Sequence, residues 1–526
     1  MDLHKLRLLF HTLRYLRLKQ IYYRIYYVVR NRFFKRAYKK TLNQREGFLK
    51  WNDSILYTDS YIGSNSFLFL NLEHRFTADI DWNYSNFGKL WTYNLNYFDF
   101  LNQQTISPEE GLRLILDYST KDSILKDGKE PYPISLRGIN WVKFLSKNMI
   151  SNFEIDQLLF NHYQTLLHNL EYHLLGNHLL ENGYSLLFGA YYFENKKFYT
   201  KAKQILKAEL SEQILNDGAH FELSPMYHQI LLFRLLDCFK LVETNQWQND
   251  DIGQLLRNKA ANMLSWLQEV TFANGSTPMV NDSAYGIAPS SQQLFDYAEQ
   301  LGIVWQQGKL SDSGYRKVTK IDYELFVDIG NVGPKYQSGH AHSDTFNFEM
   351  YVLGSPVIVD TGTSTYENNS RRQQERETAA HNTVKIDGRE QTQVWGAFRV
   401  AKRAKVIDII ERKDFLSATH NGYRNLGVNH TRQFTTETSK ILIEDFLGKD
   451  IELGSIAYFH FHPSVENIEI FDDSLKLVDE GINIIFENSQ RVALKSYDYA
   501  IGFNKRVKSK KIEVQFCNTL RTHIQL

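Results

Sequence analysis

The sequence predicts a multidomain α+β protein, in which an α/α toroid or solenoid is followed by a large antiparallel β-sandwich. From about residue 105 to 305, apolar residues recur three and four positions apart, as on one face of a helix. From about residue 315 onward they alternate in short runs between turn signals. A chain of 526 residues is long enough for two or more domains. We place a basic helical and irregular segment at 1–84, the helical domain at 85–310 and the β-sandwich at 311–526.

The helical domain is predicted from six amphipathic stretches. They are Leu112–Leu116, Trp141–Phe144, Ile155–Leu175, Tyr199–Leu215, Gln229–Leu241 and Leu255–Val270. Short turns such as Asn216-Asp217-Gly218 and Glu181-Asn182-Gly183 separate them. Helical hairpins repeated over this length indicate a toroid or a solenoid.

The β-domain is predicted from short runs of alternating residues rich in β-branched and aromatic side chains. They are Ile321–Ile329, Thr345–Leu353, Ala404–Ile410, Ser439–Phe446, Ile456–Phe461, Ile482–Phe486, Val492–Ser496 and Ile512–Phe516. Many short strands separated by turns are typical of an antiparallel sandwich. The change of period places the domain junction at about 305–320, where Gly308 and Gly314 lie.

Residues 1–40 carry twelve basic side chains and one acidic side chain, Asp2, with apolar residues at approximately helical spacing. Such a segment either lies on an anionic membrane surface or docks on its own protein with its basic face in water. We expect no cleavable signal peptide, because residues 1–30 lack an uninterrupted apolar core. No apolar run reaches the roughly 20 residues that span a bilayer. The expected location is therefore cell-associated, either cytoplasmic or peripheral to a membrane.

The composition narrows the class of partner. Lys and Arg (61) balance Asp and Glu (60), so there is no electrostatic case for a nucleic-acid partner. The two cysteines, Cys238 and Cys517, cannot form a disulfide scaffold, so stability must come from large cores. Aromatic residues make up 14% of the chain, which suits both large cores and a groove that stacks against sugar rings.

Histidines and an aspartate mark the starts and ends of predicted strands. His340 and His342 stand two apart in Gly339–Asp344, so an extended backbone would place both rings on one face. Asp360 ends the next apolar run, and His381 precedes another β-branched run. Three imidazoles and one carboxylate predict a cluster that combines metal binding with catalysis, while an isolated histidine is usually only a hydrogen-bonded residue.

Polar residues also interrupt the apolar helices. His178 and Glu181 stand three apart and share a helix face next to Asn177, which fits a binding site or only a cap and a surface pair. Ser224 is predicted to cap a helix whose first turn carries Tyr227. These side chains line a cleft in one interpretation, and in the other Tyr227 is a core residue.

Two further stretches are candidates for substrate contact. The patch Trp91–Asp99, which includes Tyr97, mixes aromatic rings with amides and fits either carbohydrate contact or a packed helix start. Arg376, with Arg371 and Arg372, is able to bind a carboxylate or a sulfate through two parallel hydrogen bonds. The alternative for these arginines is a solvated loop balanced by neighbouring glutamates.

Taken together, five motifs resemble the heparinase II/III family of polysaccharide lyases and occur in the family's order across about residues 85–410. They are Tyr93–Tyr97, Asn177–Glu181, Phe221–His228, His340–Asp344 and Ala380–Thr383. The resemblance implies an incomplete α/α toroid followed by an antiparallel β-sandwich. It also implies β-elimination on a uronic-acid-containing polysaccharide, which needs a neutralised carboxylate, a base for the C5 proton and an acid for the leaving oxygen.

The resemblance also implies a role for each residue. Asn177 would hold the substrate carboxylate, helped by His178. Tyr227 would be the acid, and the base would be either Tyr227 or His340; a tyrosine base needs a pKa lowered by nearby cations. The ligand pattern of metal-bearing members maps onto His342, Asp360 and His381, which favours a structural zinc ion. No organic cofactor is expected.

The basic N-terminal segment departs from secreted members of the family, which carry a signal peptide. We therefore expect a lyase that acts on the cell's own capsule or exopolysaccharide, with a periplasmic location as the alternative. Two other functions stay open. One is a metal-dependent glycan hydrolase, because His-x-His with Asp and His also fits such sites. The other is a non-catalytic polysaccharide-binding or assembly protein on the same fold.

Overall fold

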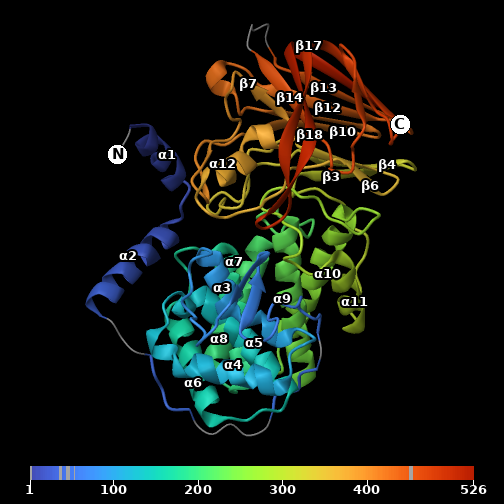
Figure 1. Cartoon of the computed structure of the whole chain (residues 1–526). Coiled ribbons are helices and arrows are strands. Elements are labelled where there is room, and N and C mark those ends of the chain that lie inside the picture. The colour runs from blue at the N-terminus through green and yellow to red at the C-terminus, as the bar shows by residue number, and fades with distance from the viewer. Residues whose placement is uncertain (1–2, 35–37, 43–47, 53, 449–453) are drawn as a thin grey trace.

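Helices and strands occupy separate parts of the computed structural model, which describes residues 3–34, 38–42, 48–52, 54–448 and 454–526 (Figure 1). The helices of the first part are α3 (Lys89–Tyr97), α4 (Pro108–Thr120), α5 (Pro131–Lys147), α6 (Phe153–His168), α7 (Gly176–Tyr192), α8 (Lys196–Gln213), α9 (Pro225–Asn245), α10 (Ile252–Val270) and α11 (Ser291–Gln300). A hairpin of β1 (Ser66–Phe69) and β2 (Leu72–Arg75) precedes them. We call this part the helical domain.

Helices α5, α7 and α9 form the centre of the helical domain. Helix α7 packs between the other two, and its residues are almost all buried. Outer helices keep a polar face; α8, for example, buries mainly the residues that recur three and four apart. The predicted helix at Ile155–Leu175 ends early, at His168, and residues 169–175 instead form the connection that leads into α7.

The second part, the β-domain, is made of two antiparallel sheets. The smaller sheet has the order β3-β4-β5-β6, with β3 at Tyr315–Thr319, β4 at Tyr323–Asp328, β5 at Phe348–Val352 and β6 at Ser355–Ile358. The larger sheet contains β7 (Val384–Ile386), β10 (Val406–Arg412), β11 (Phe415–His420), β12 (His430–Thr436), β13 (Lys440–Phe446), β14 (Ser455–His460), β15 (Ile468–Ile470), β16 (Ser474–Leu477), β17 (Ile482–Gly502) and β18 (Lys505–Gln525). Helix α12 (Ser370–Arg376) precedes β7 in the sequence, and two short strands, β8 (Val394–Trp395) and β9 (Arg399–Val400), lie between β7 and β10.

The two sheets share one apolar core. Leu325 of β4 and Met350 of β5 belong to the same buried cluster as Ile443 of β13 and Phe459 of β14. Two antiparallel sheets that enclose one core form a sandwich. The predicted fold class, a helical part followed by an antiparallel β-sandwich, is confirmed.

Two details of the β-domain differ from the prediction. The runs Ile482–Phe486 and Val492–Ser496 belong to one 21-residue strand, β17, whose register shifts near Ser489 let it continue past the polar residues between them. Strand β5 begins at Phe348 and not at Thr345. Phe346 has a φ of 71°, which takes the preceding residues out of an extended conformation.

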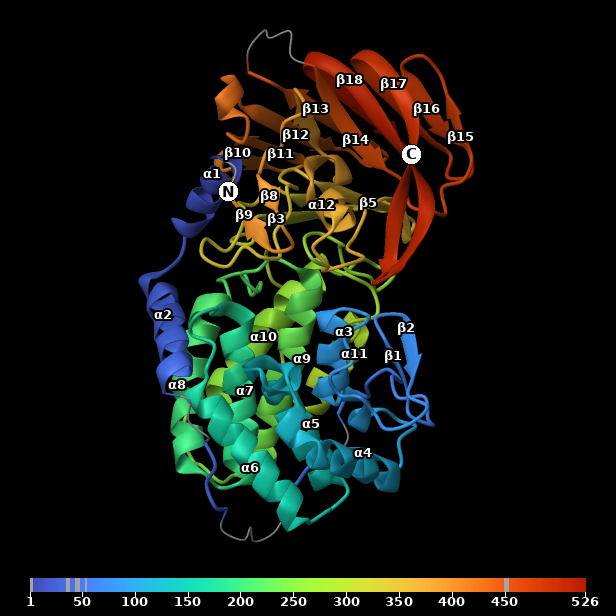
Figure 2. The ribbon, with the colours of Figure 1, turned by 60° about the vertical axis from the view of Figure 1, so that its left-hand side comes forward.

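Two N-terminal helices, α1 (Leu3–Leu13) and α2 (Leu18–Phe33), run along the outside of both domains (Figure 2). Gln20 of α2 donates from Nε2 to the carbonyl of Leu174 (3.0 Å). Thr12 of α1 donates to the carbonyl of Val400 (3.3 Å) in the β-domain. Residues 1–2 and 35–37 of the predicted basic segment lie outside the described residues. Within the described chain, no helix is both long and apolar enough to cross a bilayer.

Candidate functional site

The first turns of α7 and α9 face each other across Glu222. Helix α7 begins at Gly176, where φ is +60° and an added Cβ would lie 2.9 Å from Glu222 Oε1, so only glycine permits this approach. The next residue, Asn177, donates its backbone N–H to the same oxygen (3.4 Å). Ser224 caps α9 by accepting from the N–H of Tyr227 (3.3 Å), as predicted from the sequence.

His340 and His342 converge on one buried carboxylate, that of Asp282. They lie on a loop and not on a strand, yet His340 Nδ1 and His342 Nε2 lie 2.8 Å from the two oxygens of Asp282. Arg372 donates to both oxygens as well, at 2.6 Å through Nη2. Burial opposes the charge of Asp282, but Arg372 and the histidines hold its pKa well below the ordinary value.

The three predicted catalytic residues meet at this junction of the two domains. The rings of Tyr227 and His340 lie 4.2 Å apart between centroids. His340 Nε2 lies 3.7 Å from Glu222 Oε2, and the other oxygen of Glu222 binds the backbone of Asn177. Burial raises the pKa of Glu222, which favours its neutral form. One polar cluster, which we call the junction cluster, is therefore formed by Asn177, Glu222, Tyr227, Asp282, His340, His342 and Arg372.

The junction cluster holds polar atoms without a hydrogen-bond partner among the described residues. Asn177 Oδ1 and Glu222 Oε2 are two such atoms, although both side chains are buried. The side chain of His340 is 12% exposed, and Tyr227 is half-buried. Unsatisfied buried polar atoms are costly and are typical of sites that receive a polar ligand.

The surroundings of Tyr227 favour its protonated form. Burial raises the pKa of Tyr227 well above its ordinary value, and Tyr366, Asp282 and Glu222 raise it further. Its hydroxyl lies 3.3 Å from that of Tyr366. No cation is among the main influences on the pKa of Tyr227 within the described residues, so this residue is suited to donate a proton rather than to remove one.

His178 and Glu181 do not form the surface pair that their spacing allowed. His178 Nδ1 lies 3.0 Å from Glu171 Oε1, and the His178 side chain is 30% exposed. Glu181 is fully buried, with Oε1 3.8 Å from Arg234 Nε, and burial raises its pKa to about 7. Glu181 therefore lies beneath the cluster and not on a surface that meets substrate.

Tyr97 is linked to the junction cluster through other rings. Its ring lies 5.9 Å from that of Tyr132, whose ring lies 4.6 Å from His178. Tyr97 itself is 7% exposed, so the packed-helix interpretation of this patch describes its position better than direct sugar contact.

The predicted substrate arginines build the loops of the β-domain. Arg376 is fully buried and donates to the carbonyls of Ala341 (2.9 Å) and Gly396 (3.0 Å). Arg372 is committed to Asp282, and Arg371 donates to Glu375 (2.7 Å). The position of Arg376 does not support the expectation that it binds substrate. Its N–H groups donate to backbone carbonyls, and these hydrogen bonds fix the loop that carries His340.

The predicted zinc ligands are adjacent and fully buried. His381 Nδ1 lies 2.7 Å from Asp360 Oδ2, and the rings of His342 and His381 lie 5.3 Å apart. The second nitrogen of each ring has no hydrogen-bond partner among the described residues, which fits a cation between them. However, no group of three or more described His, Cys, Asp or Glu side chains is arranged to hold a metal ion. Zinc binding stays a prediction.

Two residues of the junction cluster were not assigned a role from the sequence. Glu222 lies inside the motif Phe221–His228, and its place between two apolar residues was the signal that it is buried. Asp282 lies in a loop 58 residues before His340 and had no signal in the local pattern. Only the fold brings Asp282 under both histidines.

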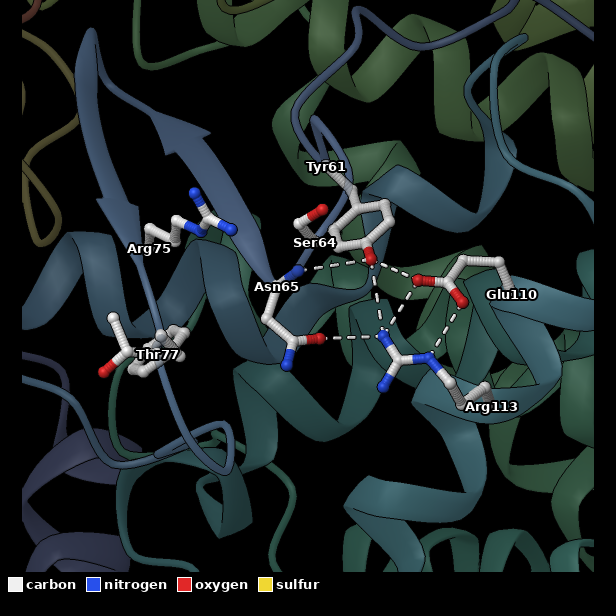
Figure 3. Close-up of a pocket in the computed structure, with 8 residues that line it drawn as sticks. Tyr61, Ser64, Asn65, Arg75, Thr77, Glu110 and Arg113 are labelled. Atoms are coloured by element: carbon white, nitrogen blue, oxygen red, sulfur yellow. Dashed lines mark hydrogen bonds and ion pairs between the residues drawn. The ribbon is translucent and has the colours of Figure 1, made fainter.

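A separate hollow of about 490 Å³ lies between the β1–β2 hairpin and the start of α4 (Figure 3). Arg113 lines it and donates to Glu110 (2.8 Å) and to Asn65 (2.8 Å). The hollow contains none of the predicted site residues, and two of its three charged side chains, Glu110 and Arg113, pair with each other. The junction cluster is therefore the better candidate for chemistry.

Comparisons with known proteins agree on one family. The family models described as "Heparinase II/III N-terminus" and "Heparinase II/III-like, C-terminal" match residues 134–301 and 304–523. A heparin-sulfate lyase of Bacteroides stercoris is 22% identical over 363 residues, which are 63% of this chain and 53% of that protein. The chain thus spans about half the length of the curated relatives that it matches.

Solved structures show the same fold. A structure of heparinase III superimposes with a TM-score of 0.63 at 18% identity, covering 86% of this chain and 79% of the other. The heparan sulfate lyase HepC of Pedobacter heparinus gives a TM-score of 0.54 at 16% identity, covering 88% and 81%. Because the two models match most of the chain and the architecture agrees, the chain belongs to the heparinase II/III family.

Proposed function

We propose that the protein is a polysaccharide lyase that cleaves an acidic, uronic-acid-containing polysaccharide by β-elimination. The observation that carries this proposal is the pairing of Tyr227 with His340, whose rings lie 4.2 Å apart beside Asn177. An acid and a base lie at one junction with the Asn177 amide, whose N–H groups can donate to a carboxylate, and together they supply the three functions that β-elimination needs. Relatives named heparin-sulfate lyases support the same reaction class.

Recognition of the uronate carboxylate is assigned to Asn177. Its amide would donate a hydrogen bond to the carboxylate and so stabilise the negative charge that develops when the C5 proton leaves. Glu222 lies beside it, and burial raises the pKa of Glu222 and so disfavours a second negative charge at this point. His178, which is partly exposed on the same helix turn, is the further candidate for contact with the sugar.

The proton transfers are assigned to His340 and Tyr227. His340 shares the Nδ1 proton with Asp282 (2.8 Å), so Nε2 carries the lone pair that removes the C5 proton. The C5–H electrons form the C4=C5 double bond as the C4–O bond breaks. The Tyr227 hydroxyl gives its proton to the leaving oxygen, and solvent later returns a proton to Tyr227 and takes one from His340. Asp282 stabilises the imidazolium in between.

The substrate proposed is a uronate polysaccharide with little sulfate, with the cell's own capsule or exopolysaccharide as the first candidate. Arg371, Arg372 and Arg376, which were expected to bind carboxylate or sulfate, are engaged with protein groups. Without these guanidinium groups, a heavily sulfated chain has fewer partners at the junction cluster.

A structural zinc ion is proposed at His342 and His381, with Asp360 as the third candidate ligand. When bound, the ion would brace the loop behind His340 and take no part in the proton transfers. Elemental analysis of the purified protein is expected to find about one zinc per chain, and chelation is expected to lower the melting temperature. Protein that contains no zinc and melts normally would remove this assignment.

The test is the ultraviolet absorbance of the unsaturated uronate product, measured with a panel of uronate polysaccharides that includes the producing cell's capsule. We expect a rise that is lost in Tyr227→Phe and His340→Ala. It should be retained in His462→Ala, a matched histidine variant whose side chain contacts Ser464 and Tyr499 outside the junction cluster. New reducing ends without absorbance would indicate a hydrolase. Binding without cleavage would indicate a non-catalytic polysaccharide-binding protein.

A further inference from the structure

The inner face of the N-terminal helix pair, α1 and α2, forms hydrogen bonds with the rest of the protein. Tyr27 and Arg30 of α2 donate to the carbonyls of Leu170 (2.5 Å) and His168 (2.6 Å). Between the helices, Arg17 forms an ion pair with Glu212. The helix pair is therefore a docked element of the fold, with a defined inner face and a defined outer face.

The outer face of the helix pair is apolar, which is the reverse of the usual arrangement. Side chains on α2 that recur three and four apart point away from the domains: Leu18, Ile21, Tyr22, Ile25, Val28 and Val29. Leu18 is 84% exposed, Ile25 60% and Val28 67%. On α1, Leu3, Leu6, Phe10 and Leu13 are also exposed and recur three and four apart. Contiguous exposed apolar patches mark a surface that meets another body.

The same helices are strongly basic. Residues 3–34 contain eight lysines and arginines and no aspartate or glutamate. Seven of the eight are exposed, all but Arg30, and Lys5, Arg7 and Arg32 are among them. An apolar stripe flanked only by positive charge is the pattern of helices that lie in the plane of an anionic membrane.

We propose that the outer face of α1 and α2 binds the protein peripherally to an anionic phospholipid surface. Tyr22 and Tyr26 stack at 6.1 Å on this side of α2 and are suited to the boundary between acyl chains and headgroups. Beside them, a groove of about 520 Å³ is lined by Tyr26, Arg30, Phe34 and His168, which combine apolar rings with cations. The two interpretations of residues 1–40 are thus compatible, because one face docks on the protein while the other faces the lipid.

A second copy of the chain is a poorer occupant of this face. Isologous pairing would bring two sets of uncompensated cations together around the apolar stripe. An anionic bilayer satisfies the cations and buries the stripe at the same time. The proposal depends on the helix pair alone and is independent of the lyase activity.

The experiment is co-sedimentation of the full chain with vesicles of phosphatidylcholine that contain or lack phosphatidylglycerol. We expect binding to the anionic vesicles, and at least a tenfold weaker partition in the triple variant Ile21→Ser, Ile25→Ser, Val28→Ser. The matched control replaces three exposed isoleucines of β10, Ile407, Ile409 and Ile410, with serine and should bind as the wild type does. Melting temperatures of all variants establish that they are folded.

A second variant separates charge from apolar burial. Replacing Lys5, Arg7 and Arg32 with glutamine should weaken binding to anionic vesicles. Added salt should reduce the difference in binding between the wild type and this variant, because salt screens the lost charges. The proposal would be overturned if the wild-type protein did not co-sediment with anionic vesicles. A dimer that the apolar triple variant dissociates would overturn it too, since the stripe would then be an interface between copies. Equal loss of binding in the β10 control would also overturn it.

Discussion

Two clusters in this protein each hold an Asp–Arg ion pair and two histidines, but they differ in how many of their polar atoms have a hydrogen-bond partner. In the junction cluster, Asp282 is bound by Arg372 and by two histidines. In the β-domain, Asp445 accepts from Arg432 (2.7 Å) and pairs with His430 (2.7 Å), which meets His420 at 3.1 Å. We call the second group the sheet cluster.

Each polar side chain of the sheet cluster has a hydrogen-bond partner within the protein. His420, His430, Arg432 and Asp445 are all buried, and His420 Nδ1 accepts from a backbone N–H. Asp445 carries its charge because Arg432 and His430 overcome the effect of burial, and its pKa falls to about 2. The two N–H groups of Arg432 Nη1 donate to the carbonyls of Phe346 and Asn382. A cluster of this kind fixes the position of strands.

In the junction cluster, some polar atoms have no hydrogen-bond partner among the described residues. Asn177, Glu222 and His342 each keep a polar atom without a hydrogen-bond partner among the described residues. His340 and Tyr227 are also partly exposed. The same residue types therefore serve structure where every donor and acceptor is satisfied and serve chemistry where some are left for a ligand.

The largest expected effect is on catalysis. Tyr227→Phe removes one hydroxyl and is expected to lower kcat by about 10²–10⁴-fold, the usual contribution of a general acid. The unfolding free energy should change by less than about 1 kcal/mol, since the ring is kept. Product absorbance and urea denaturation measure the two quantities. Activity within threefold of the wild type would exclude Tyr227 as the acid.

Breaking the sheet cluster should affect stability instead. Asp445→Asn leaves Arg432 buried without its anion and is expected to cost about 3–5 kcal/mol of unfolding free energy. Asp408→Asn, an exposed strand residue, is the matched control and should change stability by under about 0.5 kcal/mol. A stable Asp445→Asn protein would show that this pair adds little.

A smaller effect should appear in the pH dependence of stability. The folded pKa of Glu181, about 7, lies above its ordinary value of 4.5, so the folded protein holds this proton more tightly. The contribution of this proton to the free energy of unfolding is fully present below pH 4.5 and is lost as the pH rises through 7. Glu181→Gln should therefore match the wild type at pH 4.5 and be more stable at pH 8, by at most about 3 kcal/mol. Thermal melts across this range test it, and parallel curves would contradict the assignment.

The smallest expected effect is that of Tyr366. Its hydroxyl lies 3.3 Å from that of Tyr227, so Tyr366→Phe removes one neutral hydrogen bond, worth about 0.5–1.5 kcal/mol. We expect kcat to fall by about two- to tenfold, with little change in stability. A loss as large as that of Tyr227→Phe would move the acid role towards Tyr366.

Much of the architecture could be predicted because local patterns determine it. The spacing of apolar residues distinguished helices from strands. Ser224 followed by Pro225 predicted the start of α9. Errors arose where a non-local contact overrides the pattern, as at β17, which continues past Asn488 because β18 pairs with it along almost its whole length. The order of helical and β parts therefore needed no structure.

The site was predicted only in part, because residue types can be read from a sequence while their neighbours cannot. His340, Tyr227 and Asn177 were selected by motif, and the fold brings them together. Asp282 and Glu222 were not selected, because contacts between distant loops have no periodic signature.

By itself, the sequence determined the two-part architecture, the capped helix starts and the residue types able to move a proton. Only the tertiary structure decided which of them are free to act. Burial and hydrogen-bond partners set this distinction. The Arg376 guanidinium binds backbone carbonyls, Glu181 lies under the cluster, and burial together with Tyr366 and acidic neighbours raises the pKa of Tyr227. Tertiary packing also turned the apolar face of α2 outward, since its polar face found hydrogen-bond partners on the helical domain.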